Sequence, residues 1–216
     1  MRHKKQPLQF YYFLMNKAAG EVCSTVSDSH RTVYEHFPAD VLESNGAKLH
    51  SIGRLDCDTE GLLLFTNDGK LSDFLTRPEN KIEKTYFVRL KNLVTEIQQK
   101  EYAEQAELGV TLPPEKKFPE QKSNGAKIRW LSADECEITL TEGKFHEVKR
   151  IFRALKNEVI YLKRVKFAGL ELEESLNPGQ FRPLYESEVS RLKRKTKIDK
   201  KPDISKKCMR KESRTV

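Results

Sequence analysis

Cysteine is scarce in this chain of 216 residues, and the spacing of its four cysteines excludes two kinds of structure. They lie far apart, without a Cys-x-x-Cys pair and without histidines at a spacing that would complete a zinc site. We therefore expect neither a metal site nor a disulfide framework. The four residues are Cys23, Cys57, Cys136 and Cys208.

Long apolar runs are also missing. The longest, such as residues 62–65, fall far short of the roughly 20 residues that span a bilayer. Residues 10–15 are apolar, but Asn16 and Lys17 interrupt them before they reach the length of a secretory signal. With 37% hydrophobic and 33% charged residues, the composition indicates a globular, cytoplasmic protein that can bury a core and still present a cleft.

Positive charge is concentrated at one end of the chain. Residues 191–216 hold 12 Lys or Arg and three acids, whereas the remaining residues hold 28 basic and 29 acidic side chains, so the formal charge of +8 comes from this tail. Because the tail is poor in apolar residues, we expect it to be disordered and attracted to RNA phosphates. A solubilising tail without a partner is the alternative.

Apolar periodicity predicts strands in series with a few helices between them, and no internal repeat. This order favours an α+β fold around a mixed, mostly antiparallel sheet. The expected strands are 10–15, 62–66, 84–90, 126–131, 135–141, 159–167 and 169–172, and the expected helices are 32–37, 70–76, 96–108 and 147–155. Residues 49–55 are expected to form a strand or a loop.

A charged loop flanked by glycines precedes the apolar strand at 62–66. An EF-hand would need an acid at position 12 of a loop whose position 1 is Asp56, but Asn67 stands there, and a phosphate-binding loop would need a Gly-Lys-Ser/Thr ending. A lone aspartate in such a loop is commonly a turn or cap residue. A loop fixed at the mouth of a rigid strand can also hold a reactive carboxylate.

Several motifs occur together and in a fixed order. They are GRLDCDTEGLLL at 53–64 with TNDG at 66–69, LMNKAAG at 14–20, KTY at 84–86, EGKFHEVKRIF at 142–152 and LNPGQFRPL at 176–184. Over about residues 10–190 the chain resembles the ribosomal pseudouridine synthases. VCST at 22–25, KTY and the His-x-Val-Lys-Arg form are most similar to the branch that acts on small-subunit (16S) ribosomal RNA.

The resemblance implies a pseudouridine synthase fold with a central RNA-binding cleft. It divides the chain into a short N-terminal extension (1–9), a catalytic domain of two sub-domains sharing one sheet (10–190) and the basic tail (191–216). Most members of the branch carry an S4-type RNA-binding module before this domain, and we expect none here. Glu147 stands where glutamine is common in the family.

The resemblance also implies the chemistry. The enzyme breaks the N1–C1′ bond of uridine, rotates the base and re-forms the link through C5, which requires no cofactor. Asp56 is the implied catalytic carboxylate, acting on C1′, C6 or the C2′ proton. A water-excluding pocket needs a cation to keep it ionised, and Lys149 is the implied partner. Tyr86 is implied as the pocket tyrosine that stacks on the base, although a core aromatic is the alternative.

Further basic residues are expected to contact RNA. Arg54 is implied to fill the gap left by the extracted uridine, or else to pair with Asp58 or Glu60. Arg150 is expected to contact phosphate, with a solvated helix face as the alternative for it and for Lys149. The side chains expected to line the RNA path are Lys17, Lys144 and His146.

Two other functions remain open. A large-subunit (23S) ribosomal RNA target is the first, because some relatives with that target also lack the extra module. The second is a catalytically silent RNA-binding factor for ribosome assembly. The expected partner is ribosomal RNA or an assembly intermediate, and we expect a monomer.

Overall fold

The computed structural model describes residues 9–44 and 47–198, and the chain divides into a unit that ends at Leu184 and a unit that begins at Tyr185. The strands of the first unit are β1 (Tyr12–Lys17), β2 (Glu43–Ser44), β3 (Ala47–Lys48), β4 (His50–Ser51), β5 (Glu60–Thr66), β6 (Lys84–Leu90), β7 (Thr111–Leu112), β8 (Gln121–Lys122), β9 (Lys127–Trp130), β10 (Glu135–Leu140), β11 (Val159–Phe167), β12 (Leu170–Glu171) and β13 (Phe181–Pro183). Its helices are η1 (Val33–His36), α1 (Ala39–Leu42), α2 (Gly69–Thr76), η2 (Pro78–Asn80), α3 (Glu96–Leu108) and α4 (Glu147–Ala154).

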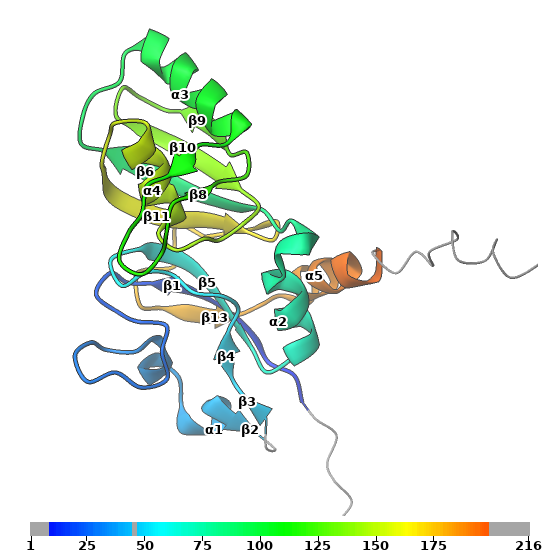
Figure 1. The fold of residues 1–216 in the computed structure, drawn as a ribbon. Coiled ribbons are helices and arrows are strands. Elements are labelled where there is room, and N and C mark those ends of the chain that lie inside the picture. The colour runs from blue at the N-terminus through cyan, green and yellow to red at the C-terminus, as the bar shows by residue number, and fades with distance from the viewer. Residues whose placement is uncertain (1–8, 45–46, 199–216) are drawn as a thin grey trace, which may run out of the picture. The chain divides into compact units, whose positions relative to one another are not determined.

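Nine of the described strands form one sheet in the order β13-β1-β5-β11-β6-β10-β9, with β4 beside β5 and β12 beside β11 (Figure 1). Each pairing between these strands is antiparallel except that of β5 with β11. The expected α+β fold with a mixed, mostly antiparallel sheet is therefore confirmed.

The parallel pairing of β5 with β11 joins the two halves of the sheet. Lys163 pairs with Glu60 and Arg164 with Gly61 at this junction. Gly61 has a φ of 105°, and a Cβ there would lie 2.3 Å from the carbonyl oxygen of Arg164. Only glycine allows the two strands to approach so closely, directly after the loop that carries Asp56.

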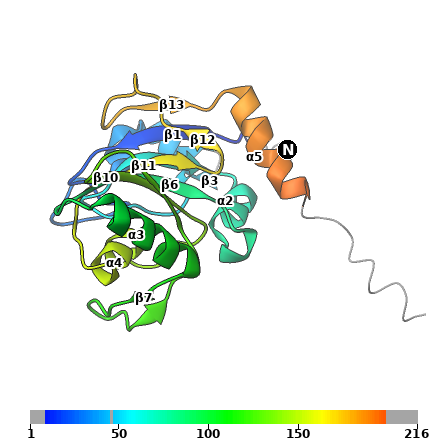
Figure 2. The ribbon, with the colours of Figure 1, turned by 90° about the horizontal axis from the view of Figure 1, so that it is seen from above.

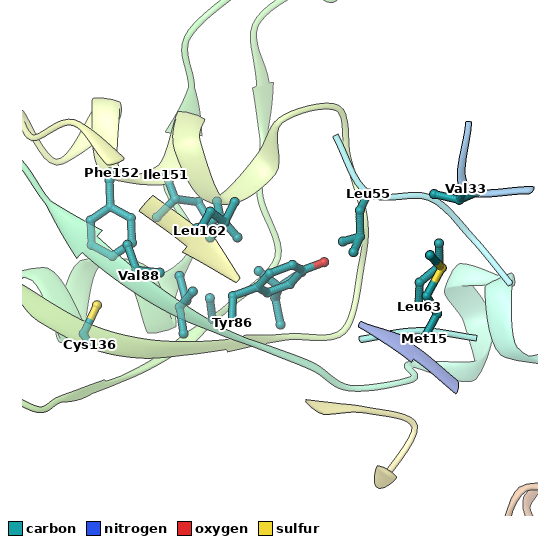
Figure 3. Packing of buried hydrophobic residues seen from close by; sticks show 14 of the residues in the cluster. Met15, Val33, Leu55, Leu63, Tyr86, Val88, Cys136, Ile151, Phe152 and Leu162 are labelled. Atoms are coloured by element: carbon teal, nitrogen blue, oxygen red, sulfur yellow. The ribbon is translucent and has the colours of Figure 1, made fainter. Parts of the chain in front are cut away.

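The core extends across both halves of the sheet. On one side of the junction it contains Met15, Val33 and Leu63, and on the other Val88, Ile151 and Phe152, among others. Figure 3 shows Tyr86 between these two groups, with its hydroxyl directed toward Leu55. The core therefore fixes both the loop after Leu55 and the strand that carries Tyr86.

Helices α3 and α4 lie on the same face of the β6-β10-β9 half (Figures 1 and 2). α4 buries Val148, Ile151 and Phe152, at the helical spacing that the sequence predicted. Residues 111–122, which we call the arm, contain β7 and β8 with a tight turn between them, and β7 lies beyond α4 in Figure 2. The sequence pattern predicted no strand or helix for these residues.

The second unit contains α5 (Glu186–Ile198) within the described residues. Helix therefore occupies residues 191–198, where disorder was expected. Two acids, Glu186 and Glu188, lie in its first turn, and basic residues follow, an arrangement that complements the helix dipole. The rest of the predicted tail, residues 199–216, and most of the predicted N-terminal extension lie outside the described residues. No helix in the described ranges could cross a bilayer.

Candidate active site

Asp56 lies in the loop between β4 and β5, and its neighbours hold it in place. Leu55 is buried, and its backbone N–H and carbonyl both contact the Cys23 sulfur, at 3.4 and 3.5 Å. The carbonyl of Asp56 accepts the N–H of Thr59 at 3.1 Å, which closes a turn. The Asp56 side chain is one-third exposed, so a fixed backbone presents an accessible carboxylate.

Lys149 brings a cation from α4 to this carboxylate. Its Nζ lies 3.7 Å from Oδ2 of Asp56 and donates to both carboxylate oxygens of Asp58, at 2.6 and 2.8 Å. Partial burial of Asp58 would raise the pKa of its carboxyl, but the hydrogen bonds and charge of Lys149 outweigh this and lower it. The predicted neighbour of Asp56 is therefore present, and Asp58 shares it.

His146 approaches Asp56 from the other side. Its Nε2 lies 3.7 Å from Oδ1 of Asp56, and its Nδ1 lies 2.7 Å from Oε1 of Glu115 on the arm. The other oxygen of Glu115 accepts from Arg153 at 3.1 Å. Partial burial would raise the pKa of Glu115, but His146 and Arg153 lower it. His146 has a φ of 47°, a conformation unusual for a residue other than glycine, at a site where such strain is commonly functional.

Tyr86 lies on β6 and is 9% exposed. Burial raises the pKa of its phenol, an effect that the nearby Arg164 guanidinium partly offsets. Arg164 on β11 is the register partner of Tyr86 and is 2% exposed. Its Nε donates to the carbonyl of Leu62 at 2.8 Å, whereas Nη2 is buried without a hydrogen-bond partner among the described residues.

Sequence reasoning missed Arg164, although a signal was present. Successive side chains of a strand alternate between faces, so Arg164 was due to point to the same side as the buried Leu162. A buried arginine needs acceptors, and an orphaned N–H beside the pocket tyrosine marks a place where a ligand oxygen can bind.

The predicted RNA contacts of Lys17 and Arg150 are wrong, because both side chains are fully buried. Lys17 donates to the carbonyls of Ala18, Cys57 and Thr59 and so supports the loop of Asp56. Arg150 donates to the carbonyls of Pro113, Phe145, Leu112 and Pro119, which joins the arm to the segment before α4. Backbone carbonyls replace the phosphates that were expected as acceptors.

The other two basic residues remain at the surface. Arg54 is exposed, and within the described residues no ion pair joins it to Asp58 or Glu60, whose partners are Lys149 and Tyr161. Lys144 is partly exposed and pairs with Glu142. Arg54 is thus available for a ligand, whereas Lys144 already has a carboxylate partner.

A second pair of carboxylates lies at the start of α4. Burial and, to a smaller extent, the adjacent Glu142 together raise the pKa of Glu147 to about 8. Burial would likewise raise the pKa of Glu142, but hydrogen bonds from Glu147, Lys144 and the N–H of Asn124 lower it. Glu147 is therefore protonated at neutral pH, beside a Glu142 whose pKa is lowered.

No group of histidine, cysteine and acidic side chains in the described ranges could hold a metal ion. A hollow of about 630 Å³ lies elsewhere and includes none of the side chains around Asp56. It is lined by Lys81, Leu108, Lys122, Ser123, Asn124, Gly125 and Thr141.

Known proteins share this arrangement of sequence and fold. Residues 11–154 match the RNA pseudouridylate synthase family. The ribosomal small subunit pseudouridine synthase A of Haemophilus influenzae is 40% identical over 181 residues, covering 84% of this chain and 73% of that protein. Its namesake from Escherichia coli K12 is 39% identical over 83% of this chain and 72% of its own. A crystal structure of a pseudouridylate synthase is similar with a TM-score of 0.75 and 40% identity, covering 85% of this chain and 74% of that one.

Proposed function

Because the chain belongs to the RNA pseudouridylate synthase family, an isomerase family, we propose that it converts one uridine of small-subunit (16S) ribosomal RNA into pseudouridine. Two of its relatives, each about 40% identical, carry the small-subunit name. The observation that carries the proposal is the accessible carboxylate of Asp56, with Lys149 and His146 each 3.7 Å away.

This geometry suits a carboxylate that must stay ionised. The reaction breaks the N1–C1′ bond and forms a C5–C1′ bond, while C5 loses a proton and N1 gains one, so that no electrons are gained or lost. Attack on C1′, addition to C6 and removal of the C2′ proton all use the ionised form of Asp56. Lys149 favours that form by its charge, and the ring of His146 lies equally close to the carboxylate.

We assign Tyr86 the role of contacting the target base. Its buried ring offers a flat face for stacking, and its raised pKa keeps the phenol protonated at neutral pH. Stacking and hydrogen-bond donation are therefore its roles, rather than removal of the C5 proton as a phenolate. The free Nη2 of Arg164 beside it is a donor for a uracil oxygen.

The exposed Arg54 is placed to occupy the gap that the extracted uridine leaves in the RNA stack. Lys144 and His146 contribute to the RNA path in this proposal. The substrate is ribosomal RNA or an assembly intermediate, the enzyme acts as a monomer in the cytoplasm, and the catalytic domain spans residues 10–190.

The test compares the wild type with the Asp56→Asn variant on unmodified 16S and 23S ribosomal RNA, with pseudouridine mapped by chemical labelling and primer extension. We expect one position in 16S RNA and a loss of rate of at least about a thousandfold in the variant, since the group that reacts is removed. Thermal unfolding of the variant serves as the control for folding. A product in 23S RNA would show that large-subunit RNA, and not 16S RNA, is the substrate. If neither RNA nor an assembly intermediate gave an Asp56-dependent product, the proposed chemistry would be contradicted.

A further inference from the structure

An aromatic stack lies beside Asp56 and outside the hydrophobic core. Phe118 and Phe145 stack with ring centroids 4.1 Å apart and 12° between their planes, and Phe145 stacks on His146 at 3.8 Å and 18°. We call Phe118, Phe145 and His146 the aromatic stack. All three are partly exposed, and neither phenylalanine belongs to the core or to the partly buried residues that pack against it.

The arm holds this stack in a fixed position. Glu115 and Phe118 exchange backbone hydrogen bonds of 2.9 Å, which closes a tight turn at Lys116 and Lys117. Glu115 also contacts His146 at 2.7 Å, so one residue connects the turn to the site. The buried Arg150 donates to the carbonyls of Pro113 and Pro119, on both sides of the turn. The stack is therefore organised before any ligand binds.

Two cations flank the rings. The Nζ of Lys116 lies 5.8 Å from the ring centroid of Phe145, and that of Lys117 lies 5.8 Å from the ring centroid of Phe118. Both lysines are exposed, and neither makes an ion pair with a carboxylate in the described part of the chain. Flat apolar rings flanked by unneutralised positive charge match the chemistry of an unpaired nucleotide, with its planar base and its phosphate.

We propose that the aromatic stack binds an unpaired base next to the target uridine, while Lys116 and Lys117 contact its phosphates. This inference rests on the proposed function, because it takes RNA at Asp56 as given. Extraction of the uridine removes a stacking contact from each neighbouring base, and the preformed aromatic stack can replace the contact that one of these bases has lost. His146 belongs to both the stack and the site, so the bound neighbour is held close to the reacting nucleotide.

The test uses Phe118→Leu, which keeps an apolar side chain but removes the flat ring, and Phe118→Trp, which restores one. Phe87→Leu is the matched control, since Phe87 is a partly exposed phenylalanine of β6 that contacts Tyr161 instead. Single-turnover rates and dissociation constants are measured on a 16S fragment around the mapped uridine. Further fragments carry an abasic site at each flanking position.

We expect Phe118→Leu to weaken RNA binding about tenfold, the usual size of one base–aromatic contact, with the rate at saturation nearly unchanged. Phe118→Trp should bind as the wild type does. On the fragment that lacks the stacked base, wild type and Phe118→Leu should bind equally. The double variant Lys116→Ala, Lys117→Ala should reduce the salt dependence of binding by one to two charges, which Lys100→Ala on α3 should leave unchanged.

Two results would overturn the inference. One is equal binding by wild type and Phe118→Leu on the intact fragment. The other is a Phe118→Leu defect that persists on every abasic fragment, since the ring would then serve only to hold the arm. If the wild type formed no pseudouridine, the proposed function would fail, while the binding comparison on unmodified 16S RNA would still decide whether the stack contacts RNA.

Discussion

Two pairs of carboxylates lie near the ends of the same short segment, residues 142–149, and their ionisation differs. Asp56 and Asp58 are partly exposed and share Lys149, with His146 close to Asp56. Glu142 and Glu147 are buried, and Lys144 is the one cation that forms an ion pair with them among the described residues. In the first pair Lys149 lowers the pKa of Asp58, whereas in the second pair burial and Glu142 raise the pKa of Glu147.

This difference indicates that the two carboxylate pairs near residues 142–149 have different roles. A charged carboxylate is needed where bonds are rearranged, and a protonated one can act as a neutral hydrogen-bond donor that fixes a loop. The N–H of Lys144 donates to Glu147 at 2.9 Å, so the protonated Glu147 accepts a hydrogen bond that holds the turn before His146. Substitutions of Lys149, Glu147 and Asp58 test how far the two pairs differ.

The largest effect is expected from Lys149→Met, which removes the cation from Asp56 and Asp58. The repulsion between the two neighbouring carboxylates is then no longer offset by a positive charge. We expect the second-order rate constant kcat/KM at pH 7 to fall by about 10- to 100-fold, because the ionised carboxylate that the reaction uses loses its cation. Lys149→Arg keeps the charge and is the control. A kcat/KM unchanged in Lys149→Met would show that the reaction does not need this cation.

Glu147→Gln should have a smaller effect, on stability and its pH dependence. The pKa of Glu147 is about 8 in the folded protein, against an ordinary value of about 4.5 when unfolded. Between these values the unfolded chain releases a proton that the folded protein keeps, so rising pH favours unfolding, and the stability contribution of this group is fully lost above pH 8.

Glutamine keeps a neutral donor toward Glu142 without this loss. We therefore expect Glu147→Gln to be more stable than wild type at pH 8, by on the order of 2 kcal/mol, with little difference at pH 5. Urea unfolding at pH 5, 6, 7 and 8 measures it, and Glu158→Gln is an exposed control. If the free energy of unfolding changed equally with pH in Glu147→Gln and the wild type, the raised pKa of Glu147 would be refuted.

The sequence sufficed to predict the α+β fold and the proximity of Lys149 to Asp56, because the first depends on apolar periodicity and the second on local motifs. It failed for Lys17 and Arg150, since a basic residue was assumed to face solvent. Whether a basic side chain is buried depends on carbonyls that the fold brings to it, and those that Arg150 meets lie up to 38 residues away.

The arm was missed for the same reason. Its Pro-rich and Lys-rich sequence has no strand periodicity, and Glu115 acquires its role only through His146 and Arg153, 31 and 38 residues later. Arg164 differs, because strand alternation placed it on the buried face. Its value as a donor beside Tyr86 still depends on the pairing of β11 with β6, which sequence alone does not give.

The smallest effect is expected from Asp58→Asn. The Asp58 side chain is 72% exposed, and an exposed ion pair contributes less than about 1 kcal/mol, so stability should change little. Because Asp58 competes with Asp56 for Lys149, its loss leaves the cation to Asp56. We expect kcat/KM at pH 7 to stay within about threefold of wild type. A loss as large as that of Lys149→Met would instead place Asp58 itself in the reaction, and both members of the exposed pair would then be catalytic.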